Sequence, residues 1–216
     1  MTSPNDARRR MVEIIAERGV ADHRVLDAMQ AVPRELFVPE DLADHAHDDG
    51  ALPIEAGQTI SQPYIVALMV EAAKISPSDR VLEVGTGSGY AAAVIARLCS
   101  ELITVERHRV LADQATARLA RLGAKNATII VGDGSLGYPK LAPYDAIIVA
   151  AGAPAVPTAL TQQLAVGGRL VAPIGPWQDH QTLRRIVREG PKGLREENLC
   201  EVRFVPLVGE GGWPAG

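Results

Sequence analysis

The chain has 216 residues, of which 47% are hydrophobic and 22% are charged, a composition typical of one globular domain with a sizeable core. The 22 basic and 26 acidic residues leave a net charge of −4, which argues against a nucleic-acid-binding protein because such proteins carry a basic excess. The sequence contains no apolar run long enough to span a bilayer and no export signal, so we expect a cytoplasmic protein that does not bind membranes.

Residues 1–79 are predicted to form a helical region that covers part of the domain. The spacing of apolar residues predicts two short helices within residues 4–31, and Gly19 is a suitable end for the first of them. Residues 38–60 have no strong period, and so long a connection is usually functional or covers a site. A third helix is expected from Pro63, because the missing N–H of proline costs nothing in a first helical turn.

Strands and helices alternate from residue 80 onward. The expected strands are 80–84, 102–106, 127–132, 144–151, 167–175, 182–189 and 201–208, and the expected helices between them are 90–99, 109–123 and 157–164. This alternation predicts a single α/β domain over 1–216, built on a doubly wound, mostly parallel sheet of the seven-stranded type within residues 80–208. We expect its last two strands to form an antiparallel pair and the glycine-rich residues 209–216 to form a flexible tail.

A glycine-rich turn joins the first strand of this sheet to its helix, in the sequence EVGTGSGY. Gly85, Gly87 and Gly89 let the backbone approach a ligand closely, and the helix that begins near Tyr90 offers free N–H groups to an anion. The spacing G-x-G-x-G differs from the G-x-G-x-x-G of dinucleotide sites. The alternative is a tight turn without a ligand.

Acidic residues end three successive predicted strands. Glu106 is placed to accept hydrogen bonds from both hydroxyls of a ribose, and Asp133 from an adenine amino group, with Gly134 leaving room for the base. Glu83 is placed to accept a hydrogen bond from an ammonium group, directly or through water. Each acid alone could be a loop cap or a hydrogen-bonded strand end, but the three together predict a nucleoside ligand.

Two sets of motifs carry a resemblance to known families. The spacing E-x-G-x-G-x-G resembles that of Rossmann-like methyltransferases that use S-adenosylmethionine. Together with GQTISQPYIVALM, TVER, GDG, APYDAIIV, GGRLVAPIG and RFVPL, it resembles the protein-L-isoaspartate O-methyltransferase family from about Val32 to about Val208. The element GQTISQP is the most specific of these motifs.

The resemblance implies an enzyme that transfers a methyl group from S-adenosyl-L-methionine to the free α-carboxylate of L-isoaspartyl residues in damaged proteins and peptides. The product ester then closes to a succinimide, which starts repair. Ser61 is implied as the active-site residue, and Thr59 and Ile60 as the lining of the substrate pocket. The implied cofactor contacts are Glu83, Gly85, Thr86, Gly87, Gly89, Glu106, Asp133, Gly134 and Gln181.

Several alternatives remain open at this stage. Ser61 could act only as the cap of the helix that follows it. The fold could serve a carboxyl methyltransferase with a different peptide or small-molecule substrate, or a cofactor-binding protein without activity. The segment DHAHDDG at 44–50 contains two histidines, yet a solvated loop is expected there and no metal site. Cys99 and Cys200 predict no disulfide framework. We expect a monomer whose partners are its isoaspartyl substrates.

Overall fold

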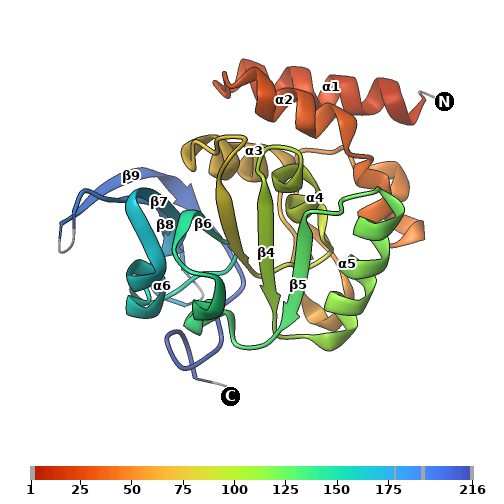
Figure 1. Cartoon of the computed structure of the whole chain (residues 1–216). Coiled ribbons are helices and arrows are strands. Elements are labelled where there is room, and N and C mark those ends of the chain that lie inside the picture. Colours follow the sequence, from red (N-terminus) through yellow and green to blue (C-terminus); the bar gives the residue numbers. More distant parts are fainter. Residues whose placement is uncertain (1–2, 178, 191–192, 215–216) are drawn as a thin grey trace.

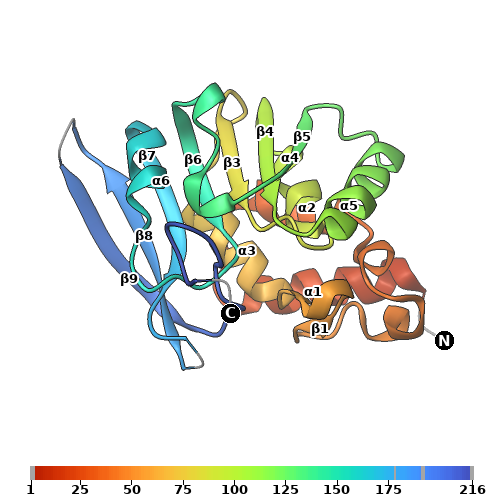
Figure 2. The same cartoon turned by 90° about the horizontal axis from the view of Figure 1, so that it is seen from below.

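The computed structural model describes residues 3–177, 179–190 and 193–214. Its centre is a seven-stranded sheet with the order β5-β4-β3-β6-β7-β8-β9, and Figure 2 shows these strands side by side. The strands are β3 (Arg80–Val84), β4 (Glu101–Glu106), β5 (Ala127–Val131), β6 (Tyr144–Val149), β7 (Leu164–Ile174), β8 (Gln181–Arg188) and β9 (Leu194–Val202). The pairs from β5 to β7 are parallel, and the pairs β7–β8 and β8–β9 are antiparallel, which confirms the predicted fold class.

Helices cover both faces of the sheet. They are α1 (Pro4–Glu17), α2 (His23–Ala31), α3 (Pro63–Ala72), α4 (Tyr90–Ala96), α5 (Arg109–Arg121) and α6 (Thr158–Gln163). Alternate residues of the buried strands point to opposite faces, so Val81 packs with helices α1 to α4 while Leu82 packs in a second cluster with α6. Figure 1 shows α1 and α2 together at the end of the molecule away from the C-terminus. None of the helices in the described ranges combines the length and hydropathy needed to cross a bilayer.

The N-terminal helices begin where their sequences supply caps. The side chain of Ser3 accepts a hydrogen bond from the Asp6 amide before α1, and Asp22 accepts one from the Arg24 amide before α2. Pro63 occupies the first turn of α3, as expected. Gly19, just past α1, has a φ of 103°, a conformation that glycine adopts without strain.

The covering segment between α2 and α3 contains only short elements. They are η1 (Arg34–Phe37), η2 (Glu40–His45), β1 (Leu52–Pro53), η3 (Glu55–Gly57) and β2 (Thr59–Ile60). The antiparallel pair β1–β2 has two residues in each strand, outside the main sheet. So short a ladder provides few main-chain hydrogen bonds. The residues after β2 therefore depend on hydrogen bonds from side chains.

The order of the strands creates a switch point between β3 and β6. From β3 the chain proceeds to β4 and then β5 in one direction, and β6 then returns to the other side of β3. The connections that leave the carboxyl ends of β3 and β6 therefore diverge, and a crevice opens between them where such sheets bind ligands.

The last predicted strand is wrong in its bounds. The structure places β9 at Leu194–Val202, whereas we expected a strand at 201–208. β9 lies at the edge of the sheet and accommodates charged residues such as Glu196 and Glu197. These charges hid the strand from a search for apolar runs. The apolar segment that follows leaves the ladder after Val202, and its Pro206 forms an isolated bridge with Gly152.

Residues 209–213, expected within a flexible tail, form a hydrogen-bonded turn. The Gly209 amide donates to the Trp213 carbonyl at 2.9 Å, and the Trp213 amide donates to the Leu207 carbonyl at 2.7 Å. The Trp213 indole also donates to the Gly152 carbonyl at 3.2 Å, and its ring lies 6.0 Å from that of Trp177. These contacts hold the turn against the carboxyl ends of the strands. Residues 215–216 of the expected tail lie outside the described residues.

Candidate functional site

A cavity lies at the switch point, beyond the carboxyl ends of β3, β4 and β6. It is bounded by the covering segment on one side and by the chain that follows β9 on the other. Its lining comprises Gln58, Thr59, Ile60, Ser61, Val66, Val84, Gly85, Thr86, Gly87, Ser88, Tyr90, Ala91, Val105, Glu106, Arg107, His108, Gly134, Ala150, Ala151, Val205, Pro206, Leu207 and Val208. The structure thus brings residues far apart in the sequence to one place.

The glycine loop between β3 and α4 forms the floor of this cavity. Gly85, Gly87 and Gly89 have φ values of 92°, 53° and 90°, which L side chains rarely adopt. Gly85 and Gly87 line the cavity, but Gly89 does not. A Cβ at Gly89 would lie 3.0 Å from the Cβ of Ala115, so this third glycine allows α5 to pack closely against the loop.

Replacing Gly89 with alanine is expected to destabilise the fold. The left-handed backbone alone costs ~1–2 kcal/mol for an alanine, and crowding against Ala115 adds to it. Gly123→Ala is the matched control, because Gly123 has a φ of 71° but a Cβ added there would meet no atom within 4 Å. Urea unfolding should show a larger loss of unfolding free energy for Gly89→Ala than for Gly123→Ala. Equal losses would show that close packing against Ala115 does not require a glycine at position 89.

Glu106 connects the glycine loop to the end of β4. Its Oε2 accepts a hydrogen bond from the Gly87 amide at 2.9 Å, and its Oε1 accepts one from the His108 amide at 2.9 Å. The side chain is buried and lines the cavity. A carboxylate has about four lone-pair positions, so both oxygens can still accept further hydrogen bonds from a ligand.

Glu83 lies beneath the loop and does not line the cavity. It is fully buried, its Oε2 accepts a hydrogen bond from the Thr104 hydroxyl at 2.6 Å, and its Oε1 has no hydrogen-bond partner among the described residues. Thr104 also lies 2.6 Å from the Thr86 hydroxyl. Because the Thr104 proton is directed to Glu83, Thr86 donates to Thr104, and the remaining lone pairs of Thr86 can accept from a ligand. Glu83 is therefore connected to the cavity by a chain of two hydroxyl groups, those of Thr104 and Thr86.

Burial raises the pKa of Glu83 to about 8, and the negative charge of Glu106 adds to this shift while Thr104 opposes it. The folded protein therefore binds a proton that the unfolded chain has lost above its ordinary pKa of about 4.5. Stability of the ligand-free protein should fall between about pH 5 and pH 8, by up to ~1.4 kcal/mol per pH unit from this group. Glutamine does not titrate, so the free energy of unfolding of wild type minus that of Glu83→Gln should fall across this window. A difference that does not change with pH would show that Glu83 does not carry the proton.

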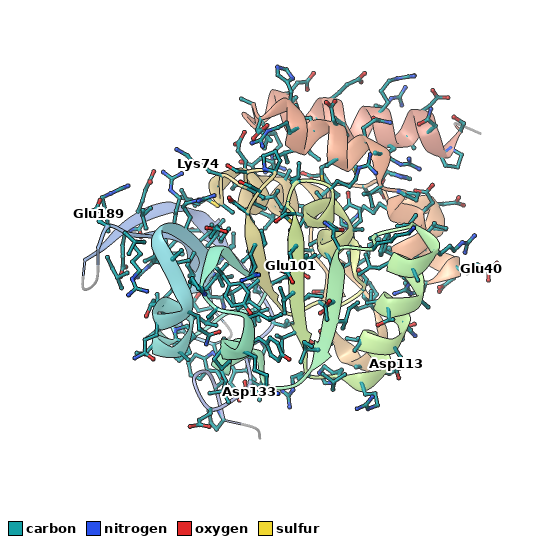
Figure 3. The ribbon with its side chains drawn as sticks, viewed as in Figure 1. Glu40, Lys74, Glu101, Asp113, Asp133 and Glu189 are labelled. Atoms are coloured by element: carbon teal, nitrogen blue, oxygen red, sulfur yellow. The ribbon has the colours of Figure 1, made fainter. Side chains whose placement is uncertain are left out.

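Asp133 and Gly134 lie at the end of β5 and differ in their exposure to the cavity. Figure 3 shows Asp133 at the opposite side of the molecule from Lys74, near the C-terminal turn. Its carboxylate accepts hydrogen bonds from the Ser135 amide and hydroxyl and from the Glu210 amide. Partial burial raises the pKa of Asp133, but these hydrogen bonds outweigh it and the pKa lies below its usual value.

Gly134 lines the cavity, whereas Asp133 is behind it. A Cβ at Gly134 would lie 2.5 Å from Cγ1 of Val84, so no side chain fits there without displacing a cavity residue. The absence of a side chain leaves a flat surface of main chain, which suits a planar group.

Gln181 lies outside the cavity lining, at the start of β8. Its amide nitrogen donates to the carbonyls of Pro176 and Asp179, and its Oε1 accepts from the Phe204 amide at 2.8 Å. The side chain thus links the loop before β8 to the chain that follows β9. This places Gln181 behind the wall that contains Val205.

Thr59, Ile60 and Ser61 line the cavity opposite the glycine loop. The N-cap position of α3 is Gln62, and no side chain at that position caps the helix. Asp49 approaches the first turn of the helix instead, with its Oδ1 accepting from the Tyr64 amide at 3.4 Å. The Ser61 hydroxyl makes no hydrogen bond within the described part of the chain, so it is available to a ligand.

Sequence reasoning missed part of the cavity wall. Arg107 and His108 lie in the loop directly after Glu106, which the sequence had already indicated as a ligand contact. Their position next to Glu106 could have predicted that they line the cavity. The wall formed by residues 205–208 overlaps the family motif RFVPL, but no local pattern placed it at the cavity. It reaches the cavity because the Gly152 amide donates to the Val205 carbonyl, and the Leu207 amide donates to the Gly152 carbonyl, both at 2.8 Å. This pairing with the chain after β6 brings the segment to the site.

Comparison with known proteins identifies the family. The sequence profile of protein-L-isoaspartate(D-aspartate) O-methyltransferases matches residues 6–212. The chain belongs to this family. The protein-L-isoaspartate O-methyltransferase of Roseiflexus sp. (strain RS-1) is 55% identical over 208 residues, which cover 96% of this chain and 94% of that protein.

Solved structures of protein-L-isoaspartate O-methyltransferases have the same fold. One has a TM-score of 0.84 and 32% identity, and covers 95% of this chain and 67% of its own. Another is described as such an enzyme from Plasmodium falciparum in complex with S-adenosyl-L-homocysteine. It has a TM-score of 0.80 and 27% identity, and the match covers 93% of this chain and 98% of that chain. These findings confirm the resemblance inferred from GQTISQP and the glycine loop.

The donor set of this protein-L-isoaspartate O-methyltransferase family member fits S-adenosylmethionine. Thr86 and Glu106 place acceptor oxygens at the cavity that could hold ammonium and hydroxyl groups, and Gly134 has no side chain there to obstruct a base. Glu83 lies below the loop with one carboxyl oxygen that has no partner among the described residues, and it is linked to the cavity through the hydroxyls of Thr104 and Thr86. Within the described residues, no cluster of three or more His, Cys, Asp or Glu side chains could hold a metal ion. In the segment 44–50, the Nδ1 of His45 lies 2.9 Å from a carboxylate oxygen of Asp48.

Proposed function

We propose that this protein methylates the free α-carboxylate of L-isoaspartyl residues in damaged proteins and peptides. The observation that carries the proposal is one cavity in which Ser61, with a hydroxyl free of internal hydrogen bonds, faces the glycine loop and Glu106. Family membership supports the substrate class. The ester product would close to a succinimide outside the enzyme, which starts the repair.

S-adenosyl-L-methionine, when bound, supplies a methyl group on a positively charged sulfur. In our proposal Glu106 accepts hydrogen bonds from the ribose hydroxyls, and Gly85 and Gly87 let the main chain approach the methionyl part. Thr86 accepts from the ammonium, and Thr104 and Glu83 keep its lone pairs turned toward the cavity. Gly134 supports the base, and Asp133 holds the turn beside it through Ser135 and Glu210.

The substrate needs positioning more than deprotonation. An α-carboxyl group has a pKa of about 3.5 and is ionised at neutral pH, so the site does not need a general base. Ser61 donates a hydrogen bond that turns a carboxylate oxygen toward the cofactor, and Thr59 and Ile60 form the wall beside it. Holding two reacting groups in line can contribute up to ~7–11 kcal/mol in ideal cases. The apolar residues Val84, Ala150 and Leu207 exclude water, which favours a reaction in which opposite charges neutralise each other.

A direct assay tests the proposal. The protein is incubated with methyl-labelled S-adenosylmethionine and a matched pair of peptides, one with L-isoaspartate and one with L-aspartate at the same position. Base-labile label on the isoaspartyl peptide alone is the expected result. Label on neither peptide, together with calorimetric binding of S-adenosylhomocysteine, would instead indicate a different substrate for the same fold.

The setting of the activity is part of the same proposal. We propose a cytoplasmic monomer that acts on isoaspartyl proteins and binds neither nucleic acid nor membranes. Both cysteines are free thiols, as is usual in a reducing compartment.

A further inference from the structure

Arg34 is a buried charged residue that the reaction described above does not use. It begins the short helix η1 in the covering segment, and its side chain has no solvent exposure. Burying a guanidinium without a carboxylate partner is unfavourable. No carboxylate of the described residues lies within 4.0 Å of it in an ion pair, so its burial must be compensated by other contacts.

Two main-chain carbonyls provide that compensation. The Nε of Arg34 donates to the Ala46 carbonyl at 2.7 Å, and its Nη2 donates to the Ser61 carbonyl at 2.8 Å. Its Nη1 is buried without a hydrogen-bond partner among the described residues. One side chain therefore joins the end of η2 to the residue that faces the substrate.

The guanidinium also lies against the cofactor side of the cavity. Its central carbon is 4.6 Å from the centroid of the Tyr90 ring, a distance typical of a cation–π contact. Tyr90 lines the cavity and is the first residue of α4, directly after the glycine loop. The Tyr90 ring is held in turn by an edge contact with Phe37 at 5.6 Å and by a hydrogen bond from its hydroxyl to the Met29 sulfur. Arg34 thus spans the gap between the two halves of the site.

The segment that carries Ser61 has few main-chain hydrogen bonds of its own, although the Ile60 side chain is buried in the core. It follows β2, whose ladder with β1 contains only the pairs Leu52–Ile60 and Pro53–Thr59. On the far side of Ser61, the Gln62 side chain donates to the carbonyl and carboxylate of Asp49. The Ser61 main chain itself is held by Arg34.

We propose that Arg34 is a positioning residue that fixes the Ser61 main chain and so aims the Ser61 hydroxyl at the substrate carboxylate. This rests on the role of Ser61 in the proposed function. Arg34 does not line the cavity, so it acts through Ser61 and not on the substrate. Its planar fork can bond two carbonyls and stack on Tyr90 at once, which the single ammonium of a lysine cannot do.

Arg34→Met tests this role by removing both hydrogen bonds while keeping much of the buried volume. We expect kcat for an isoaspartyl peptide to fall about 10- to 100-fold, because a small misplacement of an orienting group has an effect of that size. The Kd of S-adenosylhomocysteine should change by less than about 3-fold. Arg34→Lys should recover part of the lost kcat.

Arg169→Met is the matched control. Arg169 also binds main-chain carbonyls, with its Nε donating to Ala73 at 2.8 Å, and it pairs with Asp79 at 2.8 Å, but it does not line the cavity or contact the Ser61 segment. Both methionine variants should lower Tm, but only Arg34→Met should lower kcat relative to cofactor affinity. An unchanged kcat in Arg34→Met, or equal losses of kcat and cofactor affinity, would overturn the proposal.

Amide hydrogen exchange provides a readout that does not depend on the substrate. Exchange across residues 59–62 should accelerate in Arg34→Met and not in Arg169→Met; equal rates in the two variants would overturn the role of Arg34. If wild type leaves isoaspartyl peptides unlabelled, the proposed function fails, while the exchange result still decides whether Arg34 holds this segment. If Arg34→Met does not fold, Arg34→Lys decides: a lowered kcat with unchanged cofactor affinity supports the proposal, and wild-type kcat overturns it.

Discussion

Replacing Glu106 with alanine is expected to weaken binding of S-adenosylhomocysteine by ~1.5–3 kcal/mol, which is roughly a 10- to 150-fold rise in Kd. The loss has two sources. Glu106 is the acceptor proposed for the ribose hydroxyls, and it also holds the Gly87 and His108 amides at 2.9 Å each. Without the carboxylate, both loops lose the contact that shapes them around the ligand. Isothermal titration calorimetry measures the change directly.

The control for this prediction lies at the other end of the same strand. Glu101 begins β4 and pairs with Arg80 at 2.6 Å, outside the cavity lining. Glu101→Ala should leave the Kd of S-adenosylhomocysteine near that of wild type. If Glu106→Ala bound the ligand as tightly as Glu101→Ala, Glu106 would have no place in the ribose site.

Ser61→Ala is expected to lower kcat for isoaspartyl peptides by roughly 10- to 150-fold, because a hydrogen bond to a charged group contributes ~1.5–3 kcal/mol. The Kd of S-adenosylhomocysteine should stay nearly constant, since in our proposal the hydroxyl contacts the substrate and not the cofactor. Stability should also change little, because the hydroxyl does not cap α3. Steady-state kinetics on a peptide, with calorimetry on the cofactor product, separates these quantities.

Ser100→Ala is a suitable comparison for Ser61→Ala. The Ser100 hydroxyl donates to the carbonyls of Ser78 and Asp79 at 2.9 Å each, at the amino end of β4. Its removal should reduce stability without affecting kcat. A loss of cofactor affinity in Ser61→Ala as large as its loss of kcat would count against an orienting role for Ser61.

Local patterns in the sequence were sufficient for most of the fold. The strands β3 to β6 are largely apolar, and α5 has buried apolar residues at helical spacing, so these elements are specified by their own residues. The pattern fails at β9, whose edge position permits charges that a buried strand excludes. It also does not record the hydrogen bonds that residues 209–213 make with Asp133, Ser135 and Gly152.

The sequence by itself determined the part of the cavity that we propose for the cofactor, because Gly85, Gly87 and Glu106 lie in one strand–loop–helix–strand unit whose geometry follows from local rules. Only the tertiary structure decided which acids face the cavity and which act from behind it. Glu83 and Asp133 are engaged by Thr104, Ser135 and the C-terminal turn, partners up to 77 residues away along the chain. The contact of Arg34 with Ser61 likewise spans 27 residues. Such contacts arise when packed elements meet, and no local periodicity records them.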